Sequence, residues 1–324
     1  MALPRVLYWS HAPETVYEVL RRCAAGFAEV VTLDQDDPQL RKEALLEADA
    51  VIVAAHPIKS EDIDLGRKIR LVHHQGVGYQ DTVPVDTLRQ REIRLALTPE
   101  GTTTGVAEHT VMLMLAVCKR LSHVDAELRQ GRWHVNTYRS ESRELSGMTV
   151  GYIGFGRIGQ AVAARLHAFG VNAVFYDPGI AQKSIAAGDA RATALSLPEL
   201  LSASDIVSLH LPFSQAAKHL INENALRAMK RGAILINASR GGLVDEMALA
   251  IALQTGHLAG AGLDCFEVEP ARVGHPLFEL YNVVVTPHSA AATIDALQTK
   301  MTALFENIGR WHSGLALANE VNLK

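Results

Sequence analysis

A glycine-rich segment in the middle of the chain has the residue types and spacing that bind a dinucleotide. Three glycines in a G-x-G-x-x-G pattern directly follow Thr149 to Ile153, a run that predicts a buried strand. The first glycine permits a tight turn, the second lets the backbone approach a pyrophosphate, and the third lets a helix pack on the strand. The N–H groups that begin this helix could bind phosphate. The cofactor-binding candidates in this loop are Gly154, Gly156, Arg157, Ile158 and Gly159.

An acidic residue follows at the distance at which such a fold recognises ribose. Val171 to Tyr176 predicts the next strand, and Asp177 stands at its end. Its carboxylate could hydrogen-bond the ribose hydroxyls of NAD and would repel the 2′-phosphate of NADP. Pro178, Gly179 and Ile180 supply no cation for that phosphate. A glycine-rich turn that binds nothing is the alternative, but the ordered strand, glycines, helix, strand and acid favour an NAD site.

Polar residues also follow three later predicted strands, where an open α/β sheet builds its site. These segments are Asn237 to Gly242, Asp264 to Pro270, and Thr286 to Ser289. Taken alone, Arg240 or His288 would more often be a surface or structural residue. Their shared position at strand ends makes them candidates for chemistry.

The surrounding elements predict how these segments are positioned. Six strands with intervening helices follow Met148, the number typical of a dinucleotide-binding doubly wound sheet. They are expected at Val150–Ile153, Ala173–Tyr176, Asp205–Leu209, Ala233–Asn237, Gly260–Asp264 and Val283–Thr286. The segment before Thr98 alternates strands and helices as a second α/β unit without a phosphate fingerprint. Val106 to Leu121 predicts a long apolar helix that bridges two domains, and Ala290 to Ser313 predicts a last helix that returns to the first.

Composition excludes several classes of protein. The 324 residues are 48% hydrophobic and 20% charged, as in an ordinary globular protein, and the net charge of −4 gives no reason to expect nucleic acid or an acidic membrane as partner. Cys23, Cys118 and Cys265 are scattered, which predicts neither disulfides nor a metal site and fits a reducing cytoplasm. The N-terminus has no pattern of a signal peptide, and the apolar run Val111 to Val117 is too short to span a membrane.

Six segments, taken together, carry a family resemblance. They are Gly76-Val77-Gly78-Tyr79, Val106-Ala107-Glu108-His109, the glycine loop, Ile236 to Glu246, Gly262 to Pro270, and Thr286-Pro287-His288. In these segments and in their order, over essentially the whole length, the chain resembles the D-isomer-specific 2-hydroxyacid dehydrogenases, a family that includes hydroxypyruvate/glyoxylate reductases and phosphoglycerate dehydrogenases. The resemblance implies two doubly wound parallel-sheet α/β domains and a homodimer. A Rossmann NAD-binding domain of residues 101–289 would be inserted in a flavodoxin-like substrate domain of residues 1–100 and 290–324.

The resemblance also implies catalytic roles. Arg240 would bind the substrate's carboxylate and carbonyl, His288 would be the acid–base group, and Glu269 would pair with it. An imidazolium titrates near neutrality and can protonate a carbonyl oxygen, and a neighbouring carboxylate raises its pKa. A guanidinium can bind a 2-keto acid bidentately and stabilise the growing negative charge. The register before Pro270 selects Glu269, while Glu267 is expected to be solvated.

Further binding residues are implied by the same resemblance. Ala238, Ser239, Asp264 and His288 would contact the cofactor, although a structural hydrogen-bonding role for Asp264 fits nearly as well. The substrate would be bound by Gln75, Gly76, Val77, Gly78, Arg240 and His288. Backbone N–H groups in the glycine turn can form an anion-binding nest, and an ordinary glycine turn is the alternative. His73 could instead be a core strand residue.

Departures from the family pattern leave the substrate open. Ala290 and Ala291 stand where many members have paired glycines, and Gln80 stands where many have aspartate. Formate dehydrogenases resemble this pattern but place glutamine where this chain has Glu269, which argues against that activity. An NAD-sensing corepressor of the same fold is the alternative from another class, because fold alone does not determine function.

Overall fold

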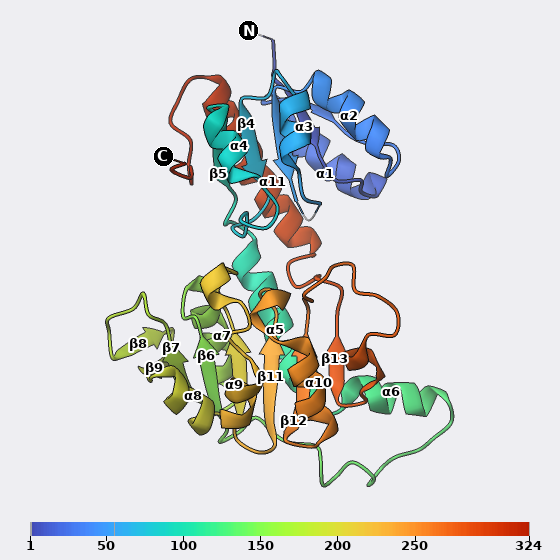
Figure 1. The fold of residues 1–324 in the computed structure, drawn as a ribbon, viewed down its shortest axis with the longest axis vertical. Helices are drawn as coiled ribbons and strands as arrows, with labels where there is room; N and C mark the ends of the chain where they lie inside the picture. The colour runs from blue at the N-terminus through green and yellow to red at the C-terminus, as the bar shows by residue number, and fades with distance from the viewer. Residues whose placement is uncertain (1, 55, 324) are drawn as a thin grey trace. The chain divides into compact units, whose positions relative to one another are not determined.

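The computed structural model describes residues 2–54 and 56–323. The chain forms two compact units, one made of Met1–Thr102 with Ala292–Lys324 and the other of Thr103–Ala291. Figure 1 shows a sheet with helices packed against it in each unit. No helix in the described part of the chain is both long and apolar enough to cross a membrane.

The first unit is built on a five-stranded parallel sheet. Its strands are β1 (Arg5–Tyr8), β2 (Glu29–Val31), β3 (Ala50–Val53), β4 (Leu71–His74) and β5 (Arg94–Leu97), in the order β2-β1-β3-β4-β5. This is the flavodoxin-like order, which reverses direction between β1 and β3. Successive side chains of β1 and β3 enter two separate hydrophobic clusters, one on each face of the sheet. The strands are therefore continuous apolar runs, as expected for a parallel sheet covered on both sides.

Five helices pack around this sheet. They are α1 (Glu14–Ala24), α2 (Pro38–Leu46), α3 (Ser60–Leu65), α4 (Val85–Gln90) and the C-terminal α11 (Ile294–His312). Thr293 caps α11 by accepting the Ala296 N–H at 3.1 Å, so the helix begins later than Ala290. Met301, Leu304 and Phe305 of α11 are fully buried in the first unit's core. The last helix thus completes the unit that the N-terminal segment begins.

The second unit contains an eight-stranded sheet. Its strands are β6 (Thr149–Ile153), β7 (Asn172–Tyr176), β8 (Ser184–Ala187), β9 (Ala190–Ala194), β10 (Ile206–Leu209), β11 (Ala233–Asn237), β12 (Leu258–Leu263) and β13 (Val283–Val285). They are ordered β13-β12-β11-β10-β6-β7-β9-β8, and all neighbours are parallel except β8 and β9. The connections reverse between β6 and β10, where doubly wound sheets bind their ligands. The helices are α5 (Thr102–Cys118), α6 (Leu121–Arg129), α7 (Arg157–His167), α8 (Leu197–Ala203), α9 (Glu223–Ala228) and α10 (Glu246–Gln254).

Two local predictions are wrong in this unit. The sheet has eight strands and not six, because β8 and β9 form an antiparallel hairpin around Gly188, whose φ is +61°. Their alanine-rich sequence is poor in β-branched residues and hides the strand signal. The helix expected to run to Leu121 ends at Cys118, since Arg120 has a φ of +56° and its guanidinium donates to the Ala259 carbonyl at 2.9 Å. A left-handed residue there separates α5 from α6.

Candidate active site

The glycine loop leaves an open surface at the beginning of α7. Gly154 has a φ of +86°, and a Cβ there would lie 2.6 Å from the carbonyl oxygen of His210. A Cβ on Gly159 would lie 2.7 Å from the Gly154 carbonyl oxygen, so helix and strand pack at backbone distance. A Cβ on Gly156, in contrast, would meet no atom within 4 Å. The loop is therefore closed toward the protein and open where a dinucleotide's pyrophosphate would approach the helix N-terminus.

Asp177 is tied to this loop by backbone hydrogen bonds. Its Oδ2 accepts the Phe155 N–H at 2.8 Å, and its Oδ1 accepts the Gly179 N–H at 2.9 Å. The carboxylate thus stands at the end of β7 beside the turn that Gly154 makes after β6. This placement fits recognition of ribose hydroxyls. Of the loop's other candidates, Arg157 is exposed and Ile158 is half-buried.

The loop that carries Arg240 is shaped by the buried Asn237. The Asn237 Nδ2 donates to the Arg240 carbonyl at 2.9 Å, and its Oδ1 accepts the Ser239 N–H at 3.1 Å and the Ser239 hydroxyl at 2.9 Å. The Arg240 Nη1 donates to the Ser239 carbonyl at 2.8 Å. Ala238 and Ser239 are both half-buried in the same turn. The amide of Asn237 therefore folds the segment after β11 so that Arg240 follows a fixed turn.

Glu269 and His288 form a hydrogen-bonded pair after the neighbouring strands β12 and β13. The His288 Nδ1 lies 2.7 Å from the Glu269 Oε2, and the Phe266 N–H donates to the other carboxylate oxygen at 3.0 Å. Because Nδ1 faces the carboxylate, Nε2 is the ring nitrogen left for a substrate. His288 has a φ of +51°, a left-handed conformation that is uncommon for residues other than glycine. Arg240, Glu269 and His288 follow β11, β12 and β13, which are neighbours in the sheet. These residues therefore lie at the edge formed by the carboxyl ends of the strands.

The surroundings of His288 and Glu269 shift their pKa values in opposite directions. The hydrogen bond that His288 donates to Glu269, together with the negative charge of Glu269, raises the pKa of His288 and outweighs the lowering by burial and by the charge of Arg240. Burial raises the pKa of Glu269, but the hydrogen bonds from His288 and the Phe266 amide outweigh burial and lower it. The pair is therefore biased toward an imidazolium next to a carboxylate, and such an imidazolium can act as a proton donor.

Asp264 holds the segment on which His288 stands. Its buried carboxylate accepts the Thr286 hydroxyl at 2.6 Å and the Ser289 and Ala290 N–H groups at 2.8 and 2.9 Å. His109 of α5 lies 2.9 Å from the Thr286 hydroxyl and 3.4 Å from Asp264. These contacts give Asp264 a structural hydrogen-bonding role, and its contact with the cofactor stays a prediction. Sequence reasoning assigned no role to His109 or Thr286, although both lie in segments that match the family.

The expected substrate-binding turn belongs to the first unit, after β4. Gln75 accepts the Tyr8 hydroxyl at 3.1 Å, and the Gly76 N–H donates to the His74 Nδ1 at 3.0 Å. Val77 is exposed, and Gly76 and Gly78 are half-buried. His73 is buried in the core, where its Nε2 lies 3.0 Å from the Asn307 amide, and burial lowers its pKa to about 4. His73 is therefore a core strand residue, one of the two roles considered for it from the sequence.

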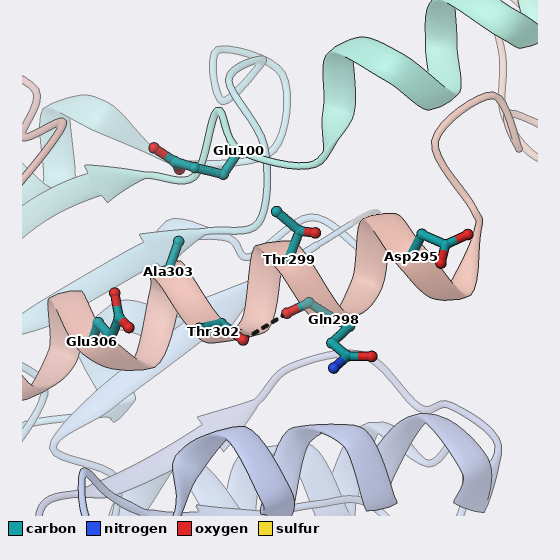
Figure 2. Close-up of a pocket in the computed structure, with 7 residues that line it drawn as sticks. All are labelled: Glu100, Asp295, Gln298, Thr299, Thr302, Ala303 and Glu306. Carbon is teal, nitrogen blue, oxygen red and sulfur yellow. Dashed lines mark hydrogen bonds between the residues drawn. The ribbon is translucent and has the colours of Figure 1, made fainter.

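A hollow of about 520 Å³ along α11 is not suited to an anionic substrate. Figure 2 shows Glu100 facing the helix, with Thr299 and Ala303 pointing toward it. The lining residues are Glu100, Asp295, Gln298, Thr299, Thr302, Ala303 and Glu306. Three of the seven are acidic and none is basic, so their charge would repel a carboxylate. Arg240, whose guanidinium is of a type that can bind a carboxylate, lies instead in the second unit.

Comparison with known proteins identifies the family to which the chain is similar. Residues 111–290 match the NAD-binding domain of the D-isomer specific 2-hydroxyacid dehydrogenases. A glyoxylate reductase of Thermofilum pendens is 39% identical over 305 residues, which cover 92% of this chain and 88% of that protein. A D-3-phosphoglycerate dehydrogenase of Mycobacterium tuberculosis is 39% identical over 322 residues, which cover 99% of this chain and 58% of that protein. The chain therefore spans little more than half the length of such phosphoglycerate dehydrogenases.

Solved structures of similar proteins point to the same family. The crystal structure of an NADPH-dependent glyoxylate/hydroxypyruvate reductase from Sinorhizobium meliloti matches with a TM-score of 0.83 and 31% identity, covering 99% of this chain and 98% of that one. The family's NAD-binding domain accounts for more than half of the chain, and the relatives extend the match over nearly all of it. This chain belongs to the D-isomer specific 2-hydroxyacid dehydrogenase family.

Proposed function

We propose that this chain is an NAD-dependent oxidoreductase that interconverts a D-2-hydroxy acid and its 2-keto acid. The observation that carries the proposal is the hydrogen-bonded pair of His288 and Glu269, at the sheet edge where Arg240 also lies. A proton donor, a guanidinium and an open glycine loop in one unit are the groups that reduction of a keto acid needs. The relatives named above are a reductase of glyoxylate, a reductase of glyoxylate and hydroxypyruvate, and a dehydrogenase of phosphoglycerate.

Each residue has a distinct part in the reaction. Bound NADH would supply the hydride that reaches the carbonyl carbon. His288 would give its Nε2 proton to the carbonyl oxygen as that oxygen becomes a hydroxyl, while Glu269 stabilises the imidazolium before the transfer. Arg240 would bind the substrate carboxylate and stabilise the negative charge that grows on the carbonyl oxygen. In the oxidative direction, neutral His288 would take the hydroxyl proton.

Asp177 supports NAD as the preferred cofactor. Its carboxylate would accept hydrogen bonds from the ribose hydroxyls, and a 2′-phosphate there would face a like charge. The Sinorhizobium relative is named as NADPH-dependent, so membership of the family does not decide this preference. Gly154, Gly156, Arg157, Ile158 and Gly159 would hold the pyrophosphate side, and Ala238, Ser239, Asp264 and His288 the nicotinamide side.

The first unit carries the turn that the family resemblance implies for substrate binding. We assign it the role of substrate domain, with the turn Gln75–Gly78 binding the carboxylate through its backbone. The exposed Val77 and the half-buried glycines on either side of it support an accessible turn. The second unit would be the NAD-binding domain.

A cytoplasmic homodimer is the assembly that we propose. The apolar α5 helix has eight buried residues and is therefore largely core, so it offers little surface for an interface. The segment after it exposes Trp133, Val135, Leu121 and Leu128, whose exposed fractions are 76, 70, 55 and 51%. Exposed apolar side chains of this kind favour a protein contact. Light scattering on a sizing column tests the dimer, and the free cysteines agree with a reducing compartment.

NADH consumption against a panel of 2-keto acids tests the proposed activity. The panel holds glyoxylate, hydroxypyruvate, pyruvate, phenylpyruvate, 2-ketogluconate and phosphohydroxypyruvate, each repeated with NADPH. Steady turnover with at least one acid, faster with NADH, is the expected result. If no acid is reduced while NADH still binds, the activity is rejected and the NAD-sensing alternative gains support.

A further inference from the structure

Two loops of the proposed active site meet at a single peptide group. A Cβ on Gly241 would lie 1.9 Å from the Phe266 carbonyl carbon, 2.0 Å from its oxygen and 2.4 Å from the Glu267 nitrogen. The residue beside Arg240 therefore rests directly on the Phe266–Glu267 peptide. The peptide just before it supplies the Phe266 N–H that holds Glu269 at 3.0 Å. The position of this peptide therefore helps to set where Glu269, and with it His288, lies relative to Arg240.

Glu246 hydrogen-bonds to this same peptide. As the first residue of α10, it accepts the Glu267 N–H on Oε1 at 2.7 Å, and its own N–H donates to the Glu267 Oε1 at 3.2 Å. The reciprocal bonds join the helix that follows the Arg240 loop to the loop that carries Glu269. Charge-assisted bonds of this kind are shorter and stronger than those between neutral groups.

His275 fixes the Glu246 carboxylate in turn. The Leu277 N–H donates to the His275 Nδ1 at 3.3 Å, so Nδ1 is an acceptor and the proton of the neutral ring is on Nε2. Nε2 therefore donates to the second oxygen of Glu246, at 2.9 Å. The His275 ring also packs against Phe266, with ring centroids 5.8 Å apart. The Glu246 side chain is only 12% exposed, and both of its oxygens have partners.

We propose that Glu246, oriented by His275, is a positioning residue that clamps the Phe266–Glu267 peptide onto Gly241 and thereby sets Glu269 and His288 relative to Arg240. Glu246 need not touch the substrate or the cofactor to do so. Its effect passes through the Phe266–Glu267 peptide and the adjoining Phe266 N–H to the carboxylate that orients the imidazole, as supporting hydrogen bonds do at preorganised sites. The inference rests on the proposed function, which makes Arg240, Glu269 and His288 the groups to be positioned.

Glu246→Ala in the full-length protein is the test. A displacement of about 1 Å can cost about 100-fold in rate, so we expect kcat to fall about 10- to 100-fold. The Kd for NADH, measured by fluorescence, should stay within about threefold because the glycine loop and Asp177 lie on other strands. Since the kcat loss concerns the transition state, KM for the keto acid should change less than kcat. Glu246→Gln keeps one acceptor oxygen and should lose about 3- to 10-fold in kcat.

Glu223→Ala is the matched control. Glu223 is also the first residue of a helix, α9, but its carboxylate is exposed and pairs only with Arg227 of its own helix among the described ion pairs. Removing it takes the same charge from a helix N-terminus. We expect unchanged kcat in this variant. If Glu246→Ala and Glu246→Gln both keep the kcat of the control, the clamp has no positioning role and the inference is wrong.

A second readout separates this inference from the proposed activity. The pKa of the His288 imidazole can be measured by NMR titration, with its signal identified by its loss in His288→Ala. Loosening Glu269 should lower this pKa in Glu246→Ala or Glu246→Gln, and Glu223→Ala should leave it unchanged. If wild type reduces no acid but this shift occurs, the activity is wrong and the clamp stands. An unshifted pKa in both Glu246 variants overturns the clamp whatever the activity, and the Gln variant decides if the Ala variant does not fold.

Discussion

The Nδ1 of His288 lies 2.7 Å from the Oε2 of Glu269, and this contact determines which form of the imidazole is stable. The carboxylate favours the doubly protonated ring and directs Nε2 away from itself. Arg240 opposes this effect, because its charge lowers the pKa of His288. The net direction is upward, so the proton that reduction consumes is retained to higher pH than on an isolated histidine, whose pKa is about 6.5.

The pH dependence of the two directions should therefore be opposite. Reduction needs protonated His288 and should decline as pH rises through its raised pKa, whereas oxidation needs neutral His288 and should increase over the same range. In Glu269→Gln the carboxylate charge is gone, so both transitions should move to lower pH. The measurement is kcat/KM against pH in each direction. A variant whose transitions coincide with those of wild type would show that Glu269 does not control the titration.

Arg240→Lys should be a severe change although it keeps the charge. A lysine ammonium cannot present the planar pair of donors that a keto acid's carboxylate and carbonyl can engage together. Loss of one such donor from a developing oxyanion costs about 10²- to 10³-fold, and we expect kcat/KM to fall by that factor. NADH affinity, measured separately, should be nearly unchanged. Comparable kcat/KM in wild type and variant would remove Arg240 from the substrate site.

Gly241 and Gly156 should respond differently to alanine. A Cβ on Gly241 would overlap the Phe266 carbonyl, so Gly241→Ala should lower the free energy of unfolding by about 1–3 kcal/mol or more. The methyl group that Gly156→Ala adds would meet no atom within 4 Å, so this variant should change the free energy of unfolding by less than about 0.5 kcal/mol. It should nevertheless weaken NADH binding, because the methyl group faces the expected pyrophosphate. Denaturant unfolding and NADH titration check both variants, and equal stability losses would contradict the packing described for Gly241.

Asp177→Asn tests cofactor preference with little change in shape. The amide oxygen can still accept the Phe155 N–H, while the charge that would repel a 2′-phosphate is removed. We expect the ratio of kcat/KM for NADPH to that for NADH to rise about tenfold, a difference of about 1.4 kcal/mol that is modest for a partly screened charge. The two cofactors are compared with one keto acid at fixed ionic strength. An unchanged ratio would mean that another group selects the cofactor.

Sequence patterns predicted those features that depend on local spacing. The glycine loop and Asp177 are separated by one helix and one strand, so their order alone placed them at adjacent strand ends. Arg240, Glu269 and His288 follow β11, β12 and β13, which are neighbours in the sheet, so the family motifs pointed to one edge. The β8–β9 hairpin was missed because its alanines favour a helix over a strand.

Contacts between distant segments could not be predicted in this way. Glu246 reads as an ordinary acidic residue at a helix start, and only the fold brings its carboxylate to the Glu267 amide. His109 lies far from Thr286 in the sequence, and its contact with that hydroxyl depends on how α5 crosses the sheet. Gly241 likewise reads as a flexible loop residue until the Phe266 carbonyl is placed against it.

The most direct test of the account compares wild type with His288→Ala in the reduction of the preferred keto acid by NADH. Removal of a general acid costs about 10²- to 10⁴-fold, and we predict a loss of turnover in that range with NADH binding retained. If the variant binds NADH and reduces the acid as fast as wild type, His288 is not the proton donor. The mechanism built on its pair with Glu269 would then be wrong.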